Sequence, residues 1–233
     1  MDLEAVFEQI PALRALPLDE RQALAPYAQL LTCQRKQAIF EEGRPTADFT
    51  FVVAGMAKLV KCSEVGRETI VNVIGPGELL CANAVCAFQP YCCRAVAMQD
   101  GTQVLVVPRR DVYQAMERSP EVARALIREI TSRGINLCSR VEELAAGQVE
   151  RRIATLILRL SEQIGEARDE GVYIPVKLSR QDLADMCGTT IETAIRVMSR
   201  FKSQKIVQTA PRGFFVVDRD GLQHIARGAA PTS

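Results

Sequence analysis

Short runs in which apolar and polar residues alternate fill the chain from Leu31 to Pro108. Glycine-containing turn signals separate these runs, at Glu42–Gly43, Val65–Gly66, Gly75–Gly77 and Asp100–Gly101. Alternation with a period of two indicates strands that bury one face. The expected strands are Ala38–Gly43, Phe49–Gly55, Ala57–Cys62, Thr69–Ile74 and Val104–Val107. Together they predict a small antiparallel β-barrel or β-roll.

The apolar period lengthens to three and four residues after Ser119. Ser119 is the expected N-cap of a long helix, with Pro120 at the first helical position. The positions of the apolar seam are Ile127, Ile130, Gly134, Leu137, Val141 and Leu144. A seam of this length can pair with a second copy of the same helix, or it can pack on the roll.

Two short helices joined by a tight turn are expected between Leu178 and Phe201. Their apolar residues are Leu183, Ala184 and Met186 in the first helix and Ala194, Val197, Met198 and Phe201 in the second, with Cys187–Gly188 as the turn. Thr189 is the expected N-cap of the second helix, and Glu192 completes a T-x-x-E capping box. The outward positions are then Thr190, Glu192, Ile195, Arg196 and Arg200. This layout predicts a helix-turn-helix, although an ordinary charged helical hairpin gives a similar pattern.

Two strand-like runs follow within Ile206–Val217, around a Pro-Arg-Gly turn with Arg212 at its tip. A strand pair at this place turns the prediction into a winged helix-turn-helix, which binds double-stranded DNA. Readers of this type occupy paired half-sites as two-fold dimers. We therefore expect the seam of the long helix to form a homodimer on a palindromic operator.

Charge supports this division of the chain. The 233 residues include 29 Lys and Arg against 28 Asp and Glu, a net charge of +1. The segment from Lys177 onward holds nine basic and five acidic residues, so it carries +4 and the remainder −3. No apolar run approaches the roughly 20 residues of a membrane span, and the first residues lack a signal-peptide character. We expect a cytoplasmic protein whose eight cysteines are thiols or metal ligands.

These motifs resemble the CRP/FNR (cyclic-AMP receptor protein / fumarate-nitrate reduction regulator) family of bacterial transcription factors, over nearly the whole chain. The matching segments are Ile39–Gly43, Phe51–Gly55, Gly75–Glu78 and the E-T-x-x-x-R signature at Glu192, Thr193 and Arg196. The resemblance implies an α+β protein with a β-roll sensor domain and flanking helices (1–118), a dimerisation helix (119–146) and a winged helix-turn-helix (147–233). It also implies a homodimer that senses a small effector and recruits or blocks RNA polymerase.

The same resemblance assigns roles in DNA recognition. Glu192 and Arg196 are the expected base readers, through a cytosine amino group and a guanine edge. Ile191 and Ile195 stand where well-known members carry Arg and Ser, and a thymine methyl would suit them. The expected phosphate contacts are Thr189, Thr190, Arg200 and Arg212.

Cysteines occupy the positions at which cyclic-nucleotide-binding members hold their ligand. By the resemblance, Cys81 replaces a Gly, Ala82 the ribose-binding Glu, Cys92 the phosphate-binding Arg and Cys93 a Ser. Cys138, on the long helix, takes a position that touches adenine. These replacements argue against cyclic AMP as the effector. The expected effector or metal residues are Cys81, Cys86, Cys92, Cys93 and Cys138, whereas packing suffices for Cys187 and Cys33.

Three chemistries suit such a pocket. An iron–sulfur cluster or another Cys-ligated metal ion ranks first, thiol redox switching at Cys92–Cys93 second and haem third. Haem would need an unusual second ligand, because Asn83 holds the family's His position and the single histidine is His224. The competing class is a thiol enzyme, but no Cys–His pairing or other catalytic motif is evident, and we expect no enzymatic activity.

Overall fold

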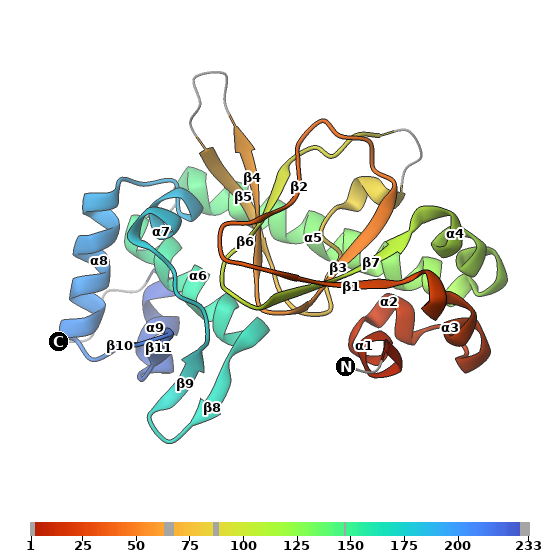
Figure 1. Cartoon of the computed structure of the whole chain (residues 1–233). Coiled ribbons are helices and arrows are strands. Elements are labelled where there is room, and N and C mark those ends of the chain that lie inside the picture. The colour runs from red at the N-terminus through yellow and green to blue at the C-terminus, as the bar shows by residue number, and fades with distance from the viewer. Residues whose placement is uncertain (1–2, 63–67, 86–88, 147, 229–233) are drawn as a thin grey trace. The chain divides into compact units, whose positions relative to one another are not determined.

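The computed structural model of the chain describes residues 3–62, 68–85, 89–146 and 148–228, with the backbone alone at residues 136 and 139–146 (Figure 1). The expected turn at Val65–Gly66 lies outside the described residues. The chain forms two compact units, Met1–Asn136 and Leu137–Ser233. Their boundary falls inside the long helix rather than at one of its ends, so the three-part division into 1–118, 119–146 and 147–233 stays a prediction.

The first unit is built on two antiparallel sheets, which confirms the expected roll. Its strands are β1 (Gln29–Cys33), β2 (Ala38–Phe40), β3 (Asp48–Ala54), β4 (Ala57–Cys62), β5 (Glu68–Ile74), β6 (Arg94–Ala97) and β7 (Thr102–Pro108). One sheet has the order β1-β7-β3 and the other β2-β6-β4-β5. Sequence patterning finds five of these strands and misses β1 and β6. Four of the five residues of β1 are at least partly accessible, so it shows no strict apolar alternation.

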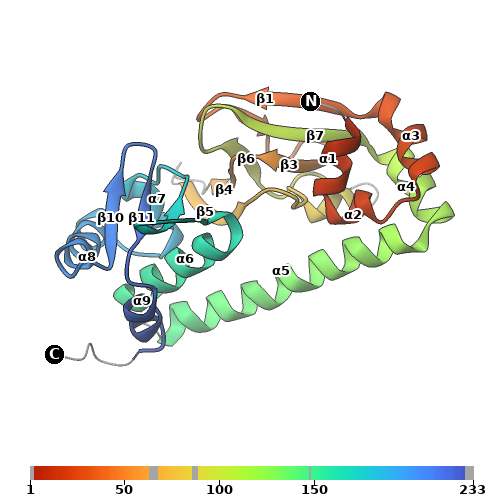
Figure 2. The same ribbon diagram turned by 90° about the horizontal axis from the view of Figure 1, so that it is seen from below.

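Helices complete the first unit around a core rich in phenylalanine. They are α1 (Leu3–Gln9), α2 (Pro11–Arg14), α3 (Leu18–Leu24), η1 (Ala25–Tyr27), η2 (Ala82–Val85) and α4 (Arg109–Arg118), with the first part of α5 (Pro120–Ala146). Phe7 of α1, Phe49 and Phe51 of β3 and Leu126 of α5 belong to one buried cluster. This cluster holds α1, α2 and the beginning of α5 against one sheet. Figure 2 shows α5 as one continuous helix, which confirms the long helix expected from Pro120.

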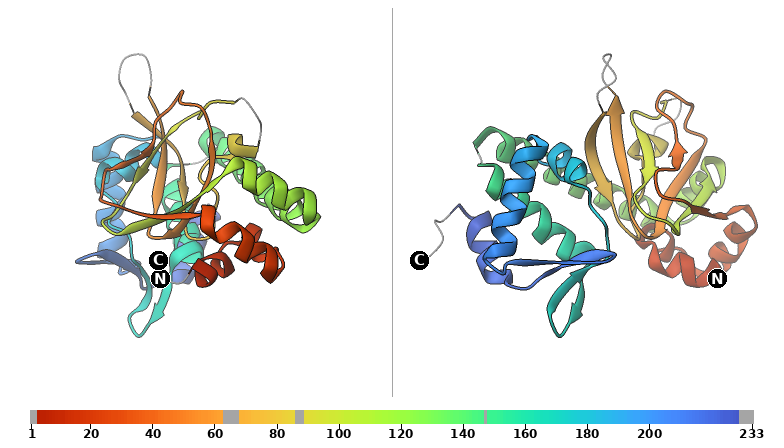
Figure 3. Two further views of the ribbon diagram at one scale, coloured as in Figure 1. Left: turned by 45° about the vertical axis from the view of Figure 1, so that its right-hand side comes forward. Right: turned by 60° about the vertical axis from the view of Figure 1, so that its left-hand side comes forward.

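The second unit combines helices with a four-stranded antiparallel sheet. Its elements are α6 (Val149–Ile164), β8 (Glu166–Arg168), β9 (Gly171–Ile174), α7 (Arg180–Met186), α8 (Ile191–Ser203), β10 (Val207–Ala210), β11 (Gly213–Val216) and α9 (Arg219–Ala226). The sheet has the order β10-β11-β9-β8, so the expected wing hairpin β10–β11 is confirmed and is extended by a second hairpin, β8–β9 (Figure 3). Ile157 of α6, Phe201 of α8 and Leu222 of α9 are fully buried.

Candidate functional site

The helix-turn-helix begins with a well-capped first helix. Ser179 is the N-cap of α7, and its hydroxyl accepts from the backbone N–H of Asp182 at 3.0 Å while the Asp182 carboxylate accepts from the N–H of Ser179 at 3.0 Å. This is a reciprocal capping box. Leu183, Ala184 and Met186 are buried as predicted. Gly188 has a φ of 57°, in the left-handed region that favours glycine, and so it makes the tight turn expected at this position.

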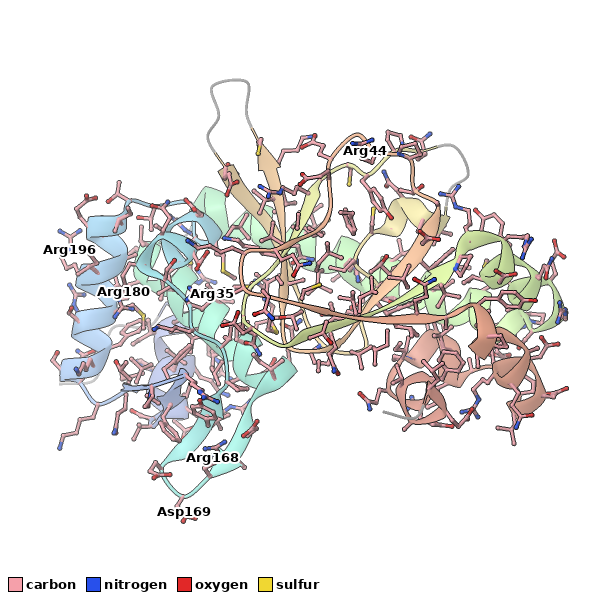
Figure 4. The ribbon with its side chains drawn as sticks, viewed as in Figure 1. Arg35, Arg44, Arg168, Asp169, Arg180 and Arg196 are labelled. Carbon is pink, nitrogen blue, oxygen red and sulfur yellow. The ribbon has the colours of Figure 1, made fainter. Side chains whose placement is uncertain are left out.

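The second helix, α8, has the two faces that its sequence predicts. Ala194, Val197, Met198 and Phe201 are buried and fix the helix on the unit. The opposite face is exposed at Thr190, Ile191, Glu192, Ile195, Arg196 and Arg200. Figure 4 shows Arg196 projecting away from α8. An exposed helix face with one acidic, two basic and two aliphatic side chains offers donors, acceptors and methyl contacts to base edges.

The N-terminus of α8 lies one residue later than predicted. Thr190, not Thr189, is the N-cap, and its hydroxyl accepts from the backbone N–H of Thr193 at 3.3 Å. The backbone N–H of Thr189 instead donates to the carbonyl of Ala184 at 2.9 Å, which holds Thr189 in the turn. The expected capping box of Thr189 and Glu192 is therefore wrong. Hydrogen bonds from the backbone N–H of Glu192 and from the Thr190 side chain lower the pKa of the Glu192 carboxyl, so it stays an acceptor.

The expected phosphate contacts differ in their surroundings. Arg200 forms an ion pair with Glu150 of α6, with 2.7 Å between Nη1 and Oε2. Arg212 is exposed in the turn between β10 and β11, at the tip of the wing. Thr190 is exposed and Thr189 is half-buried. Sequence reasoning missed Glu150, because nothing in the local pattern of α6 indicates a partner fifty residues away.

The seam of α5 is apolar and largely uncovered by the chain itself. Ile127 and Leu137 are 61% and 55% exposed, and Ile130 is half-buried. Gly134 is exposed, and a Cβ there would meet no atom within 4 Å. The side chains of Val141 and Leu144 lie outside the described residues. Exposed isoleucine and leucine on a helix whose other face is already buried indicate a surface made for association.

Three of the expected effector cysteines lie together in the first unit. The Cys92 side chain lies close enough to the thiols of both Cys81 and Cys93 to influence the pKa of each. Cys81 and Cys93 are buried, whereas Cys92 is exposed. Burial raises the pKa of the Cys81 thiol. Burial and the neighbouring Cys92 raise the pKa of Cys93 to about 12.

The other two expected ligands are Cys86 and Cys138. Cys86 lies outside the described residues, and Cys138 is exposed on α5 in the second unit. Within the part of the chain that the structure describes, no group of three or more His, Cys, Asp or Glu residues is arranged to hold a metal ion. The iron–sulfur cluster, other metal and haem therefore stay predictions.

The charged and polar side chains near the cysteines have partners within the described part of the chain. Arg94 of β6 is engaged by two carboxylates, Glu41 at 3.2 Å and Glu68 at 3.5 Å. The Lys61 ammonium donates to the Cys92 carbonyl at 3.0 Å and pairs with Glu42. The Asn83 side chain, at the family's His position, donates to the Pro90 carbonyl at 2.8 Å. The exclusion of cyclic AMP as the effector stays a prediction.

No helix among the described residues is both long enough and apolar enough to cross a membrane. The two units match separate family models. Residues 30–119 match the cyclic nucleotide-binding domain, and residues 151–225 match the Crp-like helix-turn-helix domain.

Whole-chain comparisons agree with both matches. The chain is 29% identical to the global nitrogen regulator of Nostoc sp. (strain PCC 7120) over 182 aligned residues. These residues cover 76% of this chain and 79% of that protein. It is 25% identical over 220 residues to the cyclic AMP receptor protein of Thermus thermophilus, covering 94% and 98%. The structure of FixK2 from Bradyrhizobium japonicum superposes with a TM-score of 0.74 at 23% identity, covering 88% of this chain and 99% of that one. Regulators with this helix-turn-helix bind DNA and act as dimers. The protein belongs to the CRP/FNR family of DNA-binding transcriptional regulators, which are not enzymes.

Proposed function

We propose that two copies of this regulator bind a palindromic operator and read its bases through α8. Arg196 donates two hydrogen bonds to a guanine edge, and Glu192 accepts one from a cytosine amino group. Ile191 and Ile195, both exposed on α8, contact thymine methyl groups. Thr189, Thr190, Arg200 and Arg212 contact phosphates and hold the helix in register. The observation that carries the proposal is the exposed face of α8, opposite a fully buried apolar stripe.

Arg200 would serve as a phosphate contact by exchanging partners. Its ion pair with Glu150 is on the surface, where such pairs contribute about 0–1 kcal/mol. A phosphate can replace that carboxylate at little cost. Bound in this way, the dimer would recruit or block RNA polymerase at its promoters.

The DNA-reading proposal is tested by Arg196→Ala on an operator selected from randomised duplexes. Loss of a bidentate guanine contact should weaken binding by about 1–3 kcal/mol and relax specificity at one base pair in each half-site. Arg168→Ala is the matched control, because it removes the same charge from the β8–β9 hairpin of the same unit (Figure 4). Equal affinity and unchanged specificity in the Arg196 variant would remove this residue from the reading set.

We also propose that the regulator senses oxidants through a thiol–disulfide switch at Cys92 and Cys81. Cys92 is the exposed member of the group and so meets the oxidant first. With hydrogen peroxide, the Cys92 thiolate takes one oxygen to become a sulfenic acid and hydroxide leaves. The Cys81 thiol then attacks the Cys92 sulfur, the S–S bond forms, and the sulfenic oxygen departs as water. Two thiols and one peroxide give one disulfide and two waters.

Cys81 is a better partner for Cys92 than its neighbour Cys93. The Cys81 thiol already lies close enough to the Cys92 side chain for each to influence the other, although the two residues are eleven positions apart in the chain. A disulfide between adjacent residues is strained, because normal bridges hold the two Cα atoms 4.4–6.8 Å apart with a dihedral near 90°. Closing the Cys81–Cys92 bond would pull the segment before η2 onto the segment before β6 and so change the effector pocket.

The switch is tested by titrating the reduced full-length protein with hydrogen peroxide while measuring intact mass and operator affinity together. We expect a loss of two hydrogens per chain, a changed affinity, and reversal by dithiothreitol. Cys92→Ser should abolish all three, whereas Cys62→Ser, at the exposed end of β4, should abolish none. A bleaching sulfur-to-iron absorption in protein purified without oxygen would contradict the thiol switch and favour a cluster, with Cys86 and Cys138 as further ligands.

A further inference from the structure

A hollow in the first unit lies apart from the cysteine group. It has a volume of about 630 Å³ and lies between the α1–α2 segment, the Pro76–Glu78 turn and the first half of α5. Its charged lining residues are Arg14, Glu78, Arg128, Glu129 and Arg133. No cysteine and none of the predicted seam residues of α5 lines it, so pairing of two seams does not use its walls. Its size is that of a small-molecule site.

Two of the arginines that line this hollow have no ion-pair partner among the described residues. Arg14 of α2 and Arg128 of α5 are exposed, and within the described part of the chain neither forms an ion pair. They approach the same hollow from different elements. Two guanidinium groups that converge on one cavity match the planar oxygens of a carboxylate or phosphate.

The third arginine has an unused donor. Arg133 donates through Nη2 to the Leu79 carbonyl and to the Glu129 carboxylate, the latter at 2.6 Å. Its Nε is buried and has no acceptor among the described residues. Buried N–H groups are nearly always hydrogen-bonded in folded proteins. Arg133 lines the cavity, so a turn of its side chain would bring this donor to a ligand oxygen.

The two carboxylates of the cavity are occupied by its own walls. Glu78 Oε2 accepts from the backbone N–H of Gly75 at 2.6 Å. Glu129 accepts from the backbone N–H of Leu79 and from Arg133. The three arginines and two glutamates leave an excess of one positive charge. The two carboxylates are therefore engaged in hydrogen bonds within the cavity wall, and the arginines can bind a ligand.

We propose that this cavity binds a metabolite-sized organic anion carrying carboxylate or phosphate groups, held by Arg14, Arg128 and Arg133. Because Arg14 lies on α2 and Arg128 on α5, the ligand joins the N-terminal helices to the helix on which the predicted dimer seam lies. The regulator would then have two inputs, a thiol pair in the roll and an anion beside α5. The anion site rests on neither the thiol switch nor the mode of DNA reading.

The test uses reduced full-length protein, isothermal titration calorimetry and thermal unfolding, with citrate and inorganic phosphate as separate probes at constant ionic strength. Citrate tests a carboxylate ligand and phosphate a phosphorylated one. We expect at least one probe to bind saturably with one site per chain. Arg14→Gln with Arg128→Gln should weaken that binding at least tenfold. Arg35→Gln with Arg44→Gln is the matched control, since both arginines are exposed in the same unit and outside the cavity (Figure 4).

A second variant keeps the proposal testable if the double substitution disturbs folding. Ser132→Trp places a bulky side chain at an exposed α5 position that lines the cavity and leaves all three arginines in place. It should abolish binding by filling the space. Binding that survives in both cavity variants, equal weakening in the control, or no binding of either probe to the unaltered protein would overturn the site.

Discussion

Adjacent residues in one short loop can have opposite chemical roles. Cys92 is exposed and Cys93 is buried, with burial and Cys92 raising the Cys93 pKa to about 12. At pH 8 only about one Cys93 thiol in 10⁴ is then ionised. Sequence alone groups the two as a vicinal pair, because exposure is set by how the loop meets β6 and not by the local pattern.

Cys93 should therefore react slowly with iodoacetamide, and its rate constant should rise about tenfold for each pH unit between 7 and 10 without a plateau, since only the thiolate reacts. Peptide sequencing by mass spectrometry separates Cys93 from Cys92. A plateau below pH 9 would show that Cys93 is an ordinary thiol.

Gly171 illustrates a residue whose backbone admits no substitute. Its φ is +124°, and a Cβ there would lie 2.3 Å from the Val216 carbonyl oxygen. We expect Gly171→Ala to destabilise the second unit by at least about 1–3 kcal/mol. The cause is backbone strain together with a clash with the strand β11. Urea unfolding of this variant and of the unaltered protein makes the comparison, and equal stabilities would contradict the expectation.

At the scale of elements, long periodic segments are predictable and short paired ones are not. The buried faces of α7 and α8 follow from spacing alone, and α5 begins at Pro120 as expected. β8 is three exposed residues, Glu166–Arg168, and becomes a strand only because β9 pairs with it. β9 in turn is fixed by β11, about forty residues later in the chain. Such pairing is tertiary and leaves no local signal.

The start of α8 shows how two similar local patterns compete. Thr189 and Thr190 both precede the apolar period, and only Thr189 has a Glu three residues later, at Glu192. The N–H of Thr189 is held by the Ala184 carbonyl of the preceding helix, which leaves Thr190 in the extended conformation of an N-cap. The choice is therefore made by the turn and not by the capping pattern.

Thr190→Ala should accordingly lower the free energy of unfolding by about 1 kcal/mol, whereas Thr189→Ala should cost clearly less. Both are measured by chemical denaturation of the full-length protein without DNA, so that lost phosphate contacts do not contribute. A larger loss from Thr189→Ala would restore the capping box predicted from the sequence.

At the scale of the whole molecule, the resemblance of the motifs predicts the family. The structure then shows which surfaces are exposed and can bind a partner. The roll, the long helix and the winged helix-turn-helix follow from patterning and the family landmarks. The cavity beside α5 does not, because Arg14 and Arg128 are 114 positions apart and meet only in the fold. The effector is not predictable from the sequence in the same way, since the cysteine spacing fits several chemistries, and which of these cysteines are buried is set by the fold.

The dimer is the prediction that joins these surfaces. Ile127→Glu with Leu137→Glu places two charges on exposed apolar positions of the predicted seam. Burying unpaired carboxylates between two helices is costly, so the variant should elute as a monomer where the unaltered protein elutes at twice the chain mass. Its operator affinity should fall at least 10²-fold, because the second half-site is no longer tethered to the first. Ile135→Glu is the matched control, for Ile135 is 63% exposed on the same helix but outside the seam. If the Ile135 variant dissociates and the double variant does not, the helices pair through a different face, and the exposed isoleucine and leucine must serve another partner.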